Sequence, residues 1–246
     1  MGIKNIQYPF RIRKKSNDYQ HTIADIELSV KLPADSRGTH MSRFISVIEE
    51  VKDNFDGKAA KEILKNIVRV LECKTAYVKI TFPYFLTKRA PESRESSIAK
   101  TICGYQSIIK EGSIDTSLIV EVNVTTCCPC SKEISKYGAH NQRATVRMIV
   151  GESGFIWFED LIDIIEQCGS APIYPLLKRE DEKFVTEQAY DNPKFVEDLV
   201  REIYNKTLKK YKDRISRIRI EVESDESIHQ HKAFAVIDKT VTGKEL

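Results

Sequence analysis

The sequence predicts a pseudo-symmetric α+β protein in which two successive halves carry the same order of elements, β-β-α-α-β-β. Apolar and polar residues alternate over several short segments, which is typical of strands. Apolar residues also recur at helical spacing in two regions of each half, and proline or glycine interrupts the chain between segments. No similarity of residues between the halves is evident, so the predicted repeat is one of element order.

The first half begins with strands and continues with two helices. Ala24, Ile26 and Leu28 lie on the apolar face of the clearest strand, which Pro33 is expected to end because proline has no N–H to donate to a sheet. Two amphipathic helices follow, separated by a break at residues 53–57. The elements expected here are strands at 6–12 and 24–32, helices at 41–51 and 60–71, and strands at 77–82 and 99–109 joined by a polar loop at 88–97.

The second half repeats this order. Val120 and Val122 belong to the apolar face of its first strand. Asn192 and Pro193 indicate the start of a long helix, since asparagine can cap a helix and proline at the first position loses no needed hydrogen bond. The elements expected here are strands at 118–125 and 143–150, helices at 157–167 and 193–211, and strands at 215–222 and 233–237.

Composition excludes several classes of function. With 246 residues, 41% of them hydrophobic, the chain can bury a substantial core. A formal net charge of +3 is too small to argue for binding to nucleic acid. The first twenty residues lack the apolar segment of a secretory signal, and no apolar run reaches the length of a membrane span. The cysteines do not form a disulfide framework in a chain this long, so we expect a reducing cytoplasm.

A cysteine cluster follows the first strand of the second half. Pro129 is expected to stop that strand and to leave Cys128 and Cys130 on an irregular turn, with His140 a short distance further on. A Cys-x-Cys pair can offer two thiolates to one metal, or one to a metal and one to a substrate. The same cysteines could equally be small buried hydrophobic residues. The presence of His140 and of the histidines in the segment 229–231 favours a metal or catalytic site over buried structural cysteines.

These motifs resemble the signature of the type IB GTP cyclohydrolases. The first match is Cys-Pro-Cys-Ser-Lys-Glu-Ile at 128–134, followed by Gly-Ala-His-Asn-Gln-Arg at 138–143. The further matching stretches are residues 37–44, 174–179, 181–187 and 226–231. They occur in the order of the family and cover most of the chain, so the combination is specific although no single stretch is.

The resemblance implies a fold and an assembly. Each half would be a tunnelling-fold module, with helices on one face of an antiparallel sheet; the two tandem modules would comprise residues 1–112 and 113–246. In that fold the sheets of several subunits join edge to edge, so the edge strands would be paired in a closed ring. The resemblance therefore implies a homo-oligomer, a tetramer, with active sites at the subunit interfaces.

The resemblance also implies a metal site. It makes Cys128, Glu182 and His229 ligands of a divalent metal ion, which could be zinc, manganese or ferrous iron, with water in the open position. By composition alone Glu182 lies in a charged run that is typical of a solvated face, and Glu187 is a second candidate nearby. On a regular strand His229 and His231 would point to opposite sides, which favours His229 for the metal and His231 for the substrate unless the segment bends.

Further roles follow from the same resemblance. His140 would be a general acid or base, since imidazole exchanges a proton near neutral pH, although a core histidine has the same sequence context. Cys130 would assist proton transfer, adjust the metal environment or protect the site. Glu197 would accept hydrogen bonds from N1–H and the amine of guanine, although a glutamate early in a helix also interacts favourably with the helix dipole. The basic residues expected to contact the triphosphate are Arg43, Lys132, Arg143 and Arg179.

The reaction implied is hydrolysis of GTP to 7,8-dihydroneopterin triphosphate and formate, the first step of tetrahydrofolate synthesis. Two alternatives stay open at this point. One is the archaeal, iron-dependent branch, which yields a cyclic phosphate. The other is a non-enzymatic ring-forming protein in which cysteines and histidines close a structural metal site. No nucleic acid and no membrane is expected as a partner.

Overall fold

The structure is a computed structural model that describes residues 1–32 and 40–241, so Pro33 and residues 37–39 of the matching stretch 37–44 lie outside the described residues. The strands form one sheet in the order β1-β2-β3-β4-β5-β6-β8-β9, and the short β7 pairs with β5. The first half contains β1 (Gly2–Arg13), β2 (Tyr19–Val30), α1 (Ser42–Glu49), α2 (Gly57–Val70), β3 (Thr75–Arg89) and β4 (Ser96–Lys110). The second contains β5 (Ser113–Cys127), α3 (Pro129–Ile134), β6 (Asn141–Glu152), α4 (Phe158–Glu166), β7 (Ala171–Pro172), α5 (Arg179–Asp191), α6 (Val196–Tyr211), the 3₁₀ turn η1 (Lys212–Arg214), β8 (Ile215–Asp225) and β9 (Lys232–Thr240).

The expected architecture of two tandem tunnelling-fold modules is wrong. The first half has the order β-β-α-α-β-β, but the second half adds α3, β7 and α5 to that order, and the strands of both halves belong to a single nine-stranded sheet. The compact units are also not consecutive in the chain: one comprises Met1–Tyr84 with Ile102–Ile119, and the other Phe85–Thr101 with Val120–Leu246. Alternation predicts which face of a strand is buried but not which strands pair. The proposed division into 1–112 and 113–246 stays a prediction.

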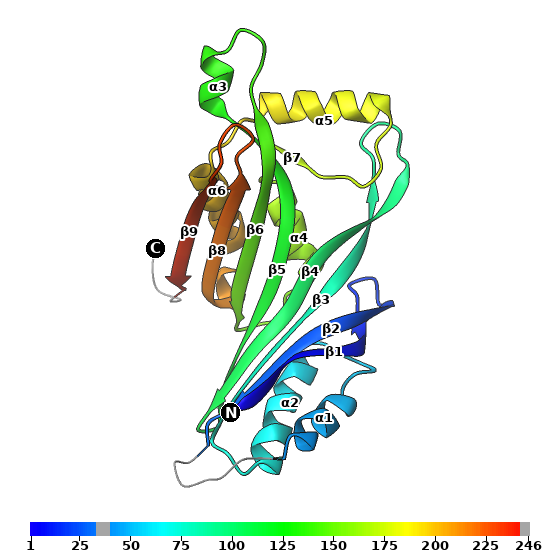
Figure 1. Cartoon of the computed structure of the whole chain (residues 1–246), viewed down its shortest axis with the longest axis vertical. Helices are drawn as coiled ribbons and strands as arrows, with labels where there is room; N and C mark the ends of the chain where they lie inside the picture. The colour runs from blue at the N-terminus through cyan, green and yellow to red at the C-terminus, as the bar shows by residue number, and fades with distance from the viewer. Residues whose placement is uncertain (33–39, 242–246) are drawn as a thin grey trace. The chain divides into compact units, whose positions relative to one another are not determined.

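In the first unit, α1 and α2 lie beside each other (Figure 1). Helix α2 begins at an N-cap, Asp56, whose carboxylate accepts from the amides of Lys58 and Ala59. Phe55, in the break between the helices, packs edge-on against Phe10 with ring centroids 4.8 Å apart. The predicted helices are therefore confirmed within a few residues at each end.

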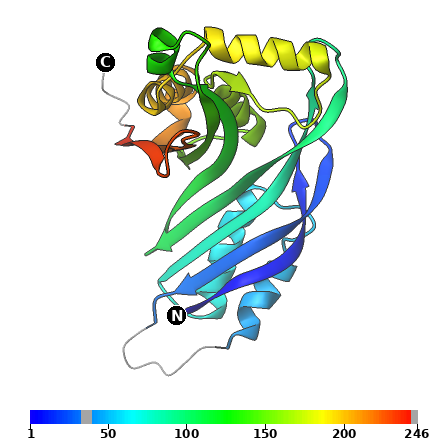
Figure 2. The same ribbon diagram turned by 45° about the horizontal axis from the view of Figure 1, so that its top comes forward.

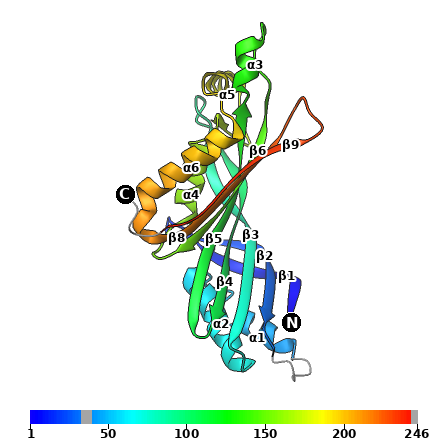
Figure 3. The same cartoon turned by 90° about the vertical axis from the view of Figure 1, so that its left-hand side faces the viewer.

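In the second unit, α4 and α6 pack against each other, and α6 lies across β8 and β9 (Figure 3). The buried stripe of α6 includes Leu199, Val200 and Ile203, as the helical spacing predicts. This helix begins at Val196 rather than at Pro193, because the backbone before it is extended and Lys194 N–H donates to the carbonyl of Cys127 at 2.9 Å. Within the described residues, no helix combines the length and the apolarity needed to cross a membrane.

Two expected loops of the second unit are helices. Cys128 and Cys130 were expected on an irregular turn, but Cys128 is the N-cap of α3 and Cys130 lies inside that helix. The charged run around Glu182 forms α5, which extends from the loop between β3 and β4 to α3 (Figure 2). Periodicity did not reveal these two helices, because α3 is too short and α5 is too polar to show a clear helical pattern of apolar residues.

The first turn of α5 is anchored by a buried carboxylate. Asp181 is fully buried and accepts from the amides of Glu92, Ser93 and Lys178 at 2.8 to 2.9 Å, and from the Ser93 hydroxyl at 2.6 Å. Burial by itself would raise the pKa of Asp181, but these hydrogen bonds outweigh burial and hold the pKa well below its ordinary value. Asp181 therefore fixes the helix that carries Glu182.

Candidate active site

A cavity of about 280 Å³ lies in the second unit, where segments distant in sequence meet. Cys128 follows β5, His140 precedes β6, Glu197 lies in the first turn of α6, and His229 and His231 lie between β8 and β9; all five line this cavity. Residues taken from separate motifs thus face one space. The lining also includes Thr126, Gln142, Lys194 and Glu226.

Backbone hydrogen bonds fix the end of β5 that leads into the cavity. Ser170 N–H donates to the carbonyl of Thr125 at 2.8 Å, and its hydroxyl accepts from Cys127 N–H at 3.1 Å. Lys194 N–H then donates to the Cys127 carbonyl. The last residues of β5 are consequently held on both sides, and Cys128 leaves the strand in a defined direction.

The start of α3 determines the environment of the Cys128 thiol. Pro129 occupies the first turn, where its missing N–H is not needed, and Cys128 Sγ accepts from Ser131 N–H at 3.5 Å. Cys128 N–H donates to the His140 carbonyl at 3.1 Å, and His140 N–H donates to the Ser131 hydroxyl at 3.2 Å. The two halves of the cysteine motif are thereby joined directly, with the thiol at a helix N-terminus.

The ring of His140 belongs to a chain of three polar side chains. Its Nδ1 lies 2.9 Å from Gln142 Oε1, and Gln142 Nε2 donates to Glu226 Oε1 at 3.4 Å. Because the amide nitrogen of Gln142 faces a carboxylate, its oxygen faces the imidazole, so Nδ1 carries the hydrogen. Nε2 of His140 is then the acceptor nitrogen, as a general base requires.

His229 and His231 are neighbours rather than residues on opposite sides of a strand. They lie in the turn after β8, and their rings stack with centroids 4.9 Å apart and planes inclined by 16°. The expectation of opposite sides depended on a regular strand, and the turn removes that condition. Both imidazoles therefore line the same cavity.

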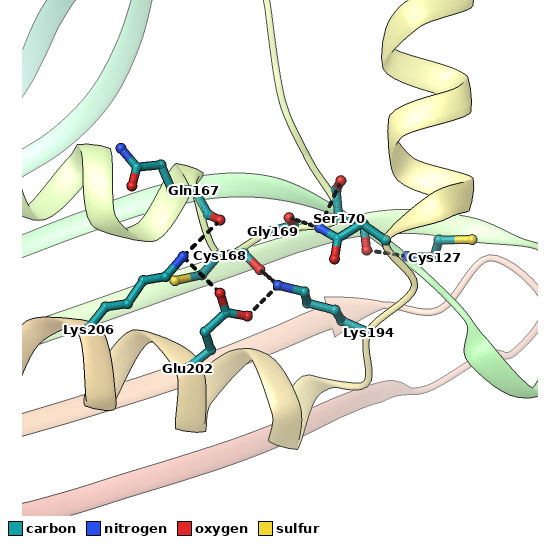
Figure 4. Close-up of polar contacts among 9 residues, drawn as sticks. Cys127, Gln167, Cys168, Gly169, Ser170, Lys194, Glu202 and Lys206 are labelled. Atoms are coloured by element: carbon teal, nitrogen blue, oxygen red, sulfur yellow. Dashed lines mark hydrogen bonds and ion pairs between the residues drawn. The ribbon is translucent and has the colours of Figure 1, made fainter.

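The segment before α6 is held by an ion-pair network (Figure 4). Lys194 Nζ donates to the Cys168 carbonyl at 2.8 Å and pairs with Glu202, which also pairs with Lys206 at 2.8 Å. Burial would raise the pKa of Glu202, but the hydrogen bonds from Lys194 and Lys206 outweigh it and lower that pKa. Burial raises the pKa of the Cys168 thiol to about 11, with a further rise from Glu202. Cys168 is thus a neutral structural thiol.

Several predicted site residues lie elsewhere. Cys130 is exposed on α3, and Glu182 and Arg179 are exposed on α5; none of them lines the cavity. Lys132 donates to the Tyr190 carbonyl at 2.6 Å and thereby joins α3 to α5. In the first unit, Arg43 donates to the Val70 carbonyl at 3.0 Å. Arg143 lines a second cavity of about 260 Å³ together with Lys88 and Lys100.

The donor groups around the first cavity suit a divalent metal only in part. Cys128 supplies a thiol, His229 and His231 supply imidazoles, and Glu226 supplies a carboxylate, all of which are ligand types of zinc or ferrous iron. Among the described residues, no three such side chains are close enough together to hold a metal ion. The predicted pair Cys128 and His229 is brought to one cavity, whereas Glu182 is not.

Four cavity residues were missed by sequence reasoning. Gln142 and Glu226 lie inside motifs but received no role, and Lys194 was treated as part of a helix start. Thr126 had one detectable signal, because it continues the buried face of Val122 and Val124 with a hydroxyl. A polar residue in an otherwise apolar register was the available indication.

Comparison of the structure with solved structures defines the fold class. Uricase from Arthrobacter globiformis matches with a TM-score of 0.56 at 8% identity, covering 100% of this chain and 94% of the other. Urate oxidase from Bacillus sp. TB-90 matches with a TM-score of 0.57 at 8% identity, covering 98% and 99%. The chain therefore has the fold of the uricases, and at this identity the likeness concerns the fold alone.

Comparison of the sequence identifies the family. A family model described as type I GTP cyclohydrolase folE2 matches residues 1–235. GTP cyclohydrolase FolE2 of Thermosipho melanesiensis is 48% identical over 241 residues, covering 98% of this chain and 92% of the relative. Those of Dictyoglomus thermophilum and Geobacter sp. are 48% and 46% identical, covering 97% and 98% of this chain and 91% and 89% of the relatives. The chain belongs to the FolE2 family of GTP cyclohydrolases, the type IB enzymes that the motifs resemble.

Proposed function

We propose that this protein hydrolyses GTP to 7,8-dihydroneopterin triphosphate and formate, the first step of tetrahydrofolate synthesis. The observation that carries the proposal is the common cavity: a thiol, three imidazoles and the carboxylate of Glu197 come from separate motifs and line one space. Membership of the FolE2 family supports the same activity. The six cysteines are all free, which supports a reducing, cytoplasmic location.

The cavity accommodates the base of GTP with Glu197 as its anchor. Its volume of about 280 Å³ is just below the roughly 300–1,000 Å³ of sites that enclose a drug-sized ligand. The base fits inside, and the triphosphate extends outward toward basic residues of the second unit, for which Lys132, Arg143 and Arg179 are the candidates. The contact expected of Arg43, which lies in the first unit, stays a prediction. Glu197 accepts from N1–H and the exocyclic amine of guanine, a pair of donors that adenine lacks on that edge.

His140 moves protons during ring opening. Gln142 holds hydrogen on Nδ1, so Nε2 accepts a proton from the attacking water and returns one to the imidazole nitrogen that leaves C8. Glu226 supports this arrangement by accepting from Gln142. His231 lies on the same cavity beside His229 and contacts the substrate. A role of Cys130 in proton transfer stays a prediction, since Cys130 is exposed on α3 and lies outside the lining of this cavity.

Cys128 and His229 would hold the divalent metal ion, with Glu182 as the third ligand. When bound, such an ion supplies a water of lowered pKa for attack on C8. Glu182 is the member of the set that the cavity does not include, whereas Glu226 lies on the cavity lining. Metal content measured in Glu182→Ala and Glu226→Ala proteins therefore decides which carboxylate completes the site, and loss of metal from the Glu226 variant alone would reject Glu182.

The test of the proposal uses two adjacent cysteines. Metal-reconstituted protein is incubated anaerobically with GTP, and formate and dihydropterin absorbance are followed. Cys128→Ala should abolish both products, because it removes the thiol from the cavity. Cys127→Ala is the matched control: Cys127 is buried outside the cavity lining, and burial raises the pKa of its thiol, so activity should persist.

Mass spectrometry of the product completes this test. A dihydropterin that keeps all three phosphates supports the proposed reaction, and a cyclic phosphate assigns the chain to the alternative product. No formate from wild-type protein that contains its full complement of metal would contradict the proposal.

A further inference from the structure

We propose that the hydroxyl of Thr126 forms a hydrogen bond with the purine ring of the bound substrate. The proposal deepens the function proposed above and rests on it. Thr126 is the second-last residue of β5 and lines the cavity shared by Cys128 and Glu197. It would be a specificity-determining contact in addition to the guanine anchor.

The hydroxyl of Thr126 is buried without a partner. The residue is 1% exposed, and in the part of the chain that the structure describes its Oγ1 has no hydrogen-bond partner. A buried hydroxyl left unpaired is unfavourable, and most buried polar side chains in folded proteins are paired. The same register positions further back along β5 carry Val122 and Val124. A valine at 126 would fill this space without the unfavourable hydroxyl.

The position of the hydroxyl indicates what it would bind. Thr126 lines the cavity and is almost fully buried, so a group that reaches its hydroxyl must leave solvent, which costs less for a planar base than for a charged chain. Among the described residues, Lys194 supplies the one ammonium group in the lining of this cavity, and Glu202 already pairs with it. The surroundings of Thr126 therefore suit an uncharged, polar ring rather than a phosphate.

Ser224 provides a matched comparison. Its hydroxyl is also fully buried and has no partner among the described residues, but Ser224 does not line the cavity. It lies on β8 opposite Ala144. A purely structural effect of removing an unpaired hydroxyl should be alike at the two positions, whereas an effect on ligand binding should be confined to Thr126.

The experiment compares Thr126→Val, Thr126→Ser and Ser224→Ala. Thr126→Val should leave the Tm unchanged or raise it, because the variant buries no unpaired hydroxyl. The KM for GTP should rise about 3- to 10-fold, as expected for one lost hydrogen bond, while kcat changes less than twofold. Thr126→Ser should retain the wild-type KM for GTP. Ser224→Ala should change neither KM nor kcat.

Calorimetric titration with GMP separates the two proposals, because it needs no turnover. Binding of GMP that is about 3- to 10-fold weaker in Thr126→Val than in wild-type protein supports the purine contact even if no formate is produced. Equal GMP affinity for Thr126→Val and wild-type protein overturns the contact while leaving the cyclohydrolase activity intact. A Tm that falls by several degrees in Thr126→Val would likewise overturn it, since the hydroxyl would then stabilise the fold.

Discussion

Gln142 connects two ionisable groups that the sequence presents as unrelated. It receives the Nδ1 hydrogen of His140 and donates to Glu226, so one amide orients both an imidazole and a carboxylate. In this arrangement the tautomer of His140 is determined by a neutral neighbour that cannot itself titrate. Nε2 is therefore the acceptor nitrogen of the His140 ring.

At the residue scale, Glu197 should decide the choice of base. We expect Glu197→Gln to lower kcat/KM for GTP by about 10- to 100-fold, because one charge-assisted acceptor is replaced by an amide. Inosine triphosphate lacks the exocyclic amine, so the wild-type preference for GTP over this analogue should shrink in the variant. Asp198→Asn, at the exposed neighbouring position of the same helix turn, is the control. An unchanged preference in Glu197→Gln would show that other groups read the amine.

At this scale the motifs that resemble the family singled out Cys128, His140, Glu197, His229 and His231, which line one cavity, while their roles stay predictions. Sequence reasoning did not single out Gln142 and Lys194, whose contacts depend on partners distant in sequence: Gln142 contacts Glu226, and Lys194 contacts Cys168. Such pairings arise only when the chain has folded. The stacking of His229 on His231 was not predicted, because the segment 229–231 is a turn rather than a strand.

At the element scale, the extended segment before α6 connects the end of β5 to the helix that carries Glu197. Lys194 uses its backbone for the Cys127 carbonyl and its side chain for the Cys168 carbonyl and Glu202. The ion pair between Lys194 and Glu202 is largely shielded from solvent, because these side chains are 13% and 33% exposed. Lys194 is accordingly a positioning residue for the cavity.

We expect Lys194→Met to cost about 1–3 kcal/mol of stability, because it removes a charge-assisted hydrogen bond and leaves the Cys168 carbonyl unpaired. The Tm should fall by about 3–10 °C for a chain of this size. Lys183→Met is the matched control, since its pair with Glu187 is exposed on both sides and contributes little. Equal Tm values for the two variants would contradict a structural role for the network.

The difference in Tm between wild-type protein and Lys194→Met should depend on pH in a defined direction. The pKa of Glu202 in the folded protein is below its ordinary value of 4.5, so the stability it contributes is present above that value and is lost as pH falls through the lowered pKa. The gap in Tm between wild-type protein and Lys194→Met should therefore be full near pH 7 and narrow at acidic pH. A gap that widens on acidification would contradict this assignment.

Elements with a long, regular pattern were predictable, and short or polar ones were not. The strands and the four amphipathic helices appear where alternation and helical spacing indicated, although β3 continues to Arg89 beyond the expected end at 82 and β5 begins at Ser113 rather than at 118. Helix α3 has six residues, too few to display a period. Helix α5 depends on the buried hydrogen bonds of Asp181 to Ser93, a contact between segments far apart in the chain.

At the scale of the whole molecule, the continuous sheet leaves edge strands to be paired. Strand β9 is at one end of the strand order, and it carries Phe234 and Val236, which are 72% and 39% exposed. Exposed apolar side chains on an edge strand favour association with another chain. We propose that copies of this chain join through such edges as a homotetramer with active sites at their interfaces.

Phe234→Asp should reduce assembly and activity together. A carboxylate on the edge strand opposes burial of that edge, so the variant should elute as a smaller species in size-exclusion chromatography with light scattering. Asn205→Asp, which adds the same charge at an exposed position of α6, should assemble and react like wild-type protein. A fully active wild-type monomer would contradict the proposed assembly.

The single sheet was not predictable, because the repeated order of elements is compatible with one sheet or with two. Strands β3, β4 and β5 have 15 residues each and contribute to both compact units. Alternation of burial along them specifies their faces only. Pairing partners depend on contacts across the fold.

Opening of the guanine ring of GTP at C8 can be followed with GTP labelled with carbon-13 at that atom, incubated anaerobically with metal-reconstituted protein and observed by NMR. The label should appear in formate, one equivalent for each dihydroneopterin triphosphate formed, and Cys128→Ala should release none. Label that remains in the purine, with protein folded and metal bound, would contradict ring opening at this cavity.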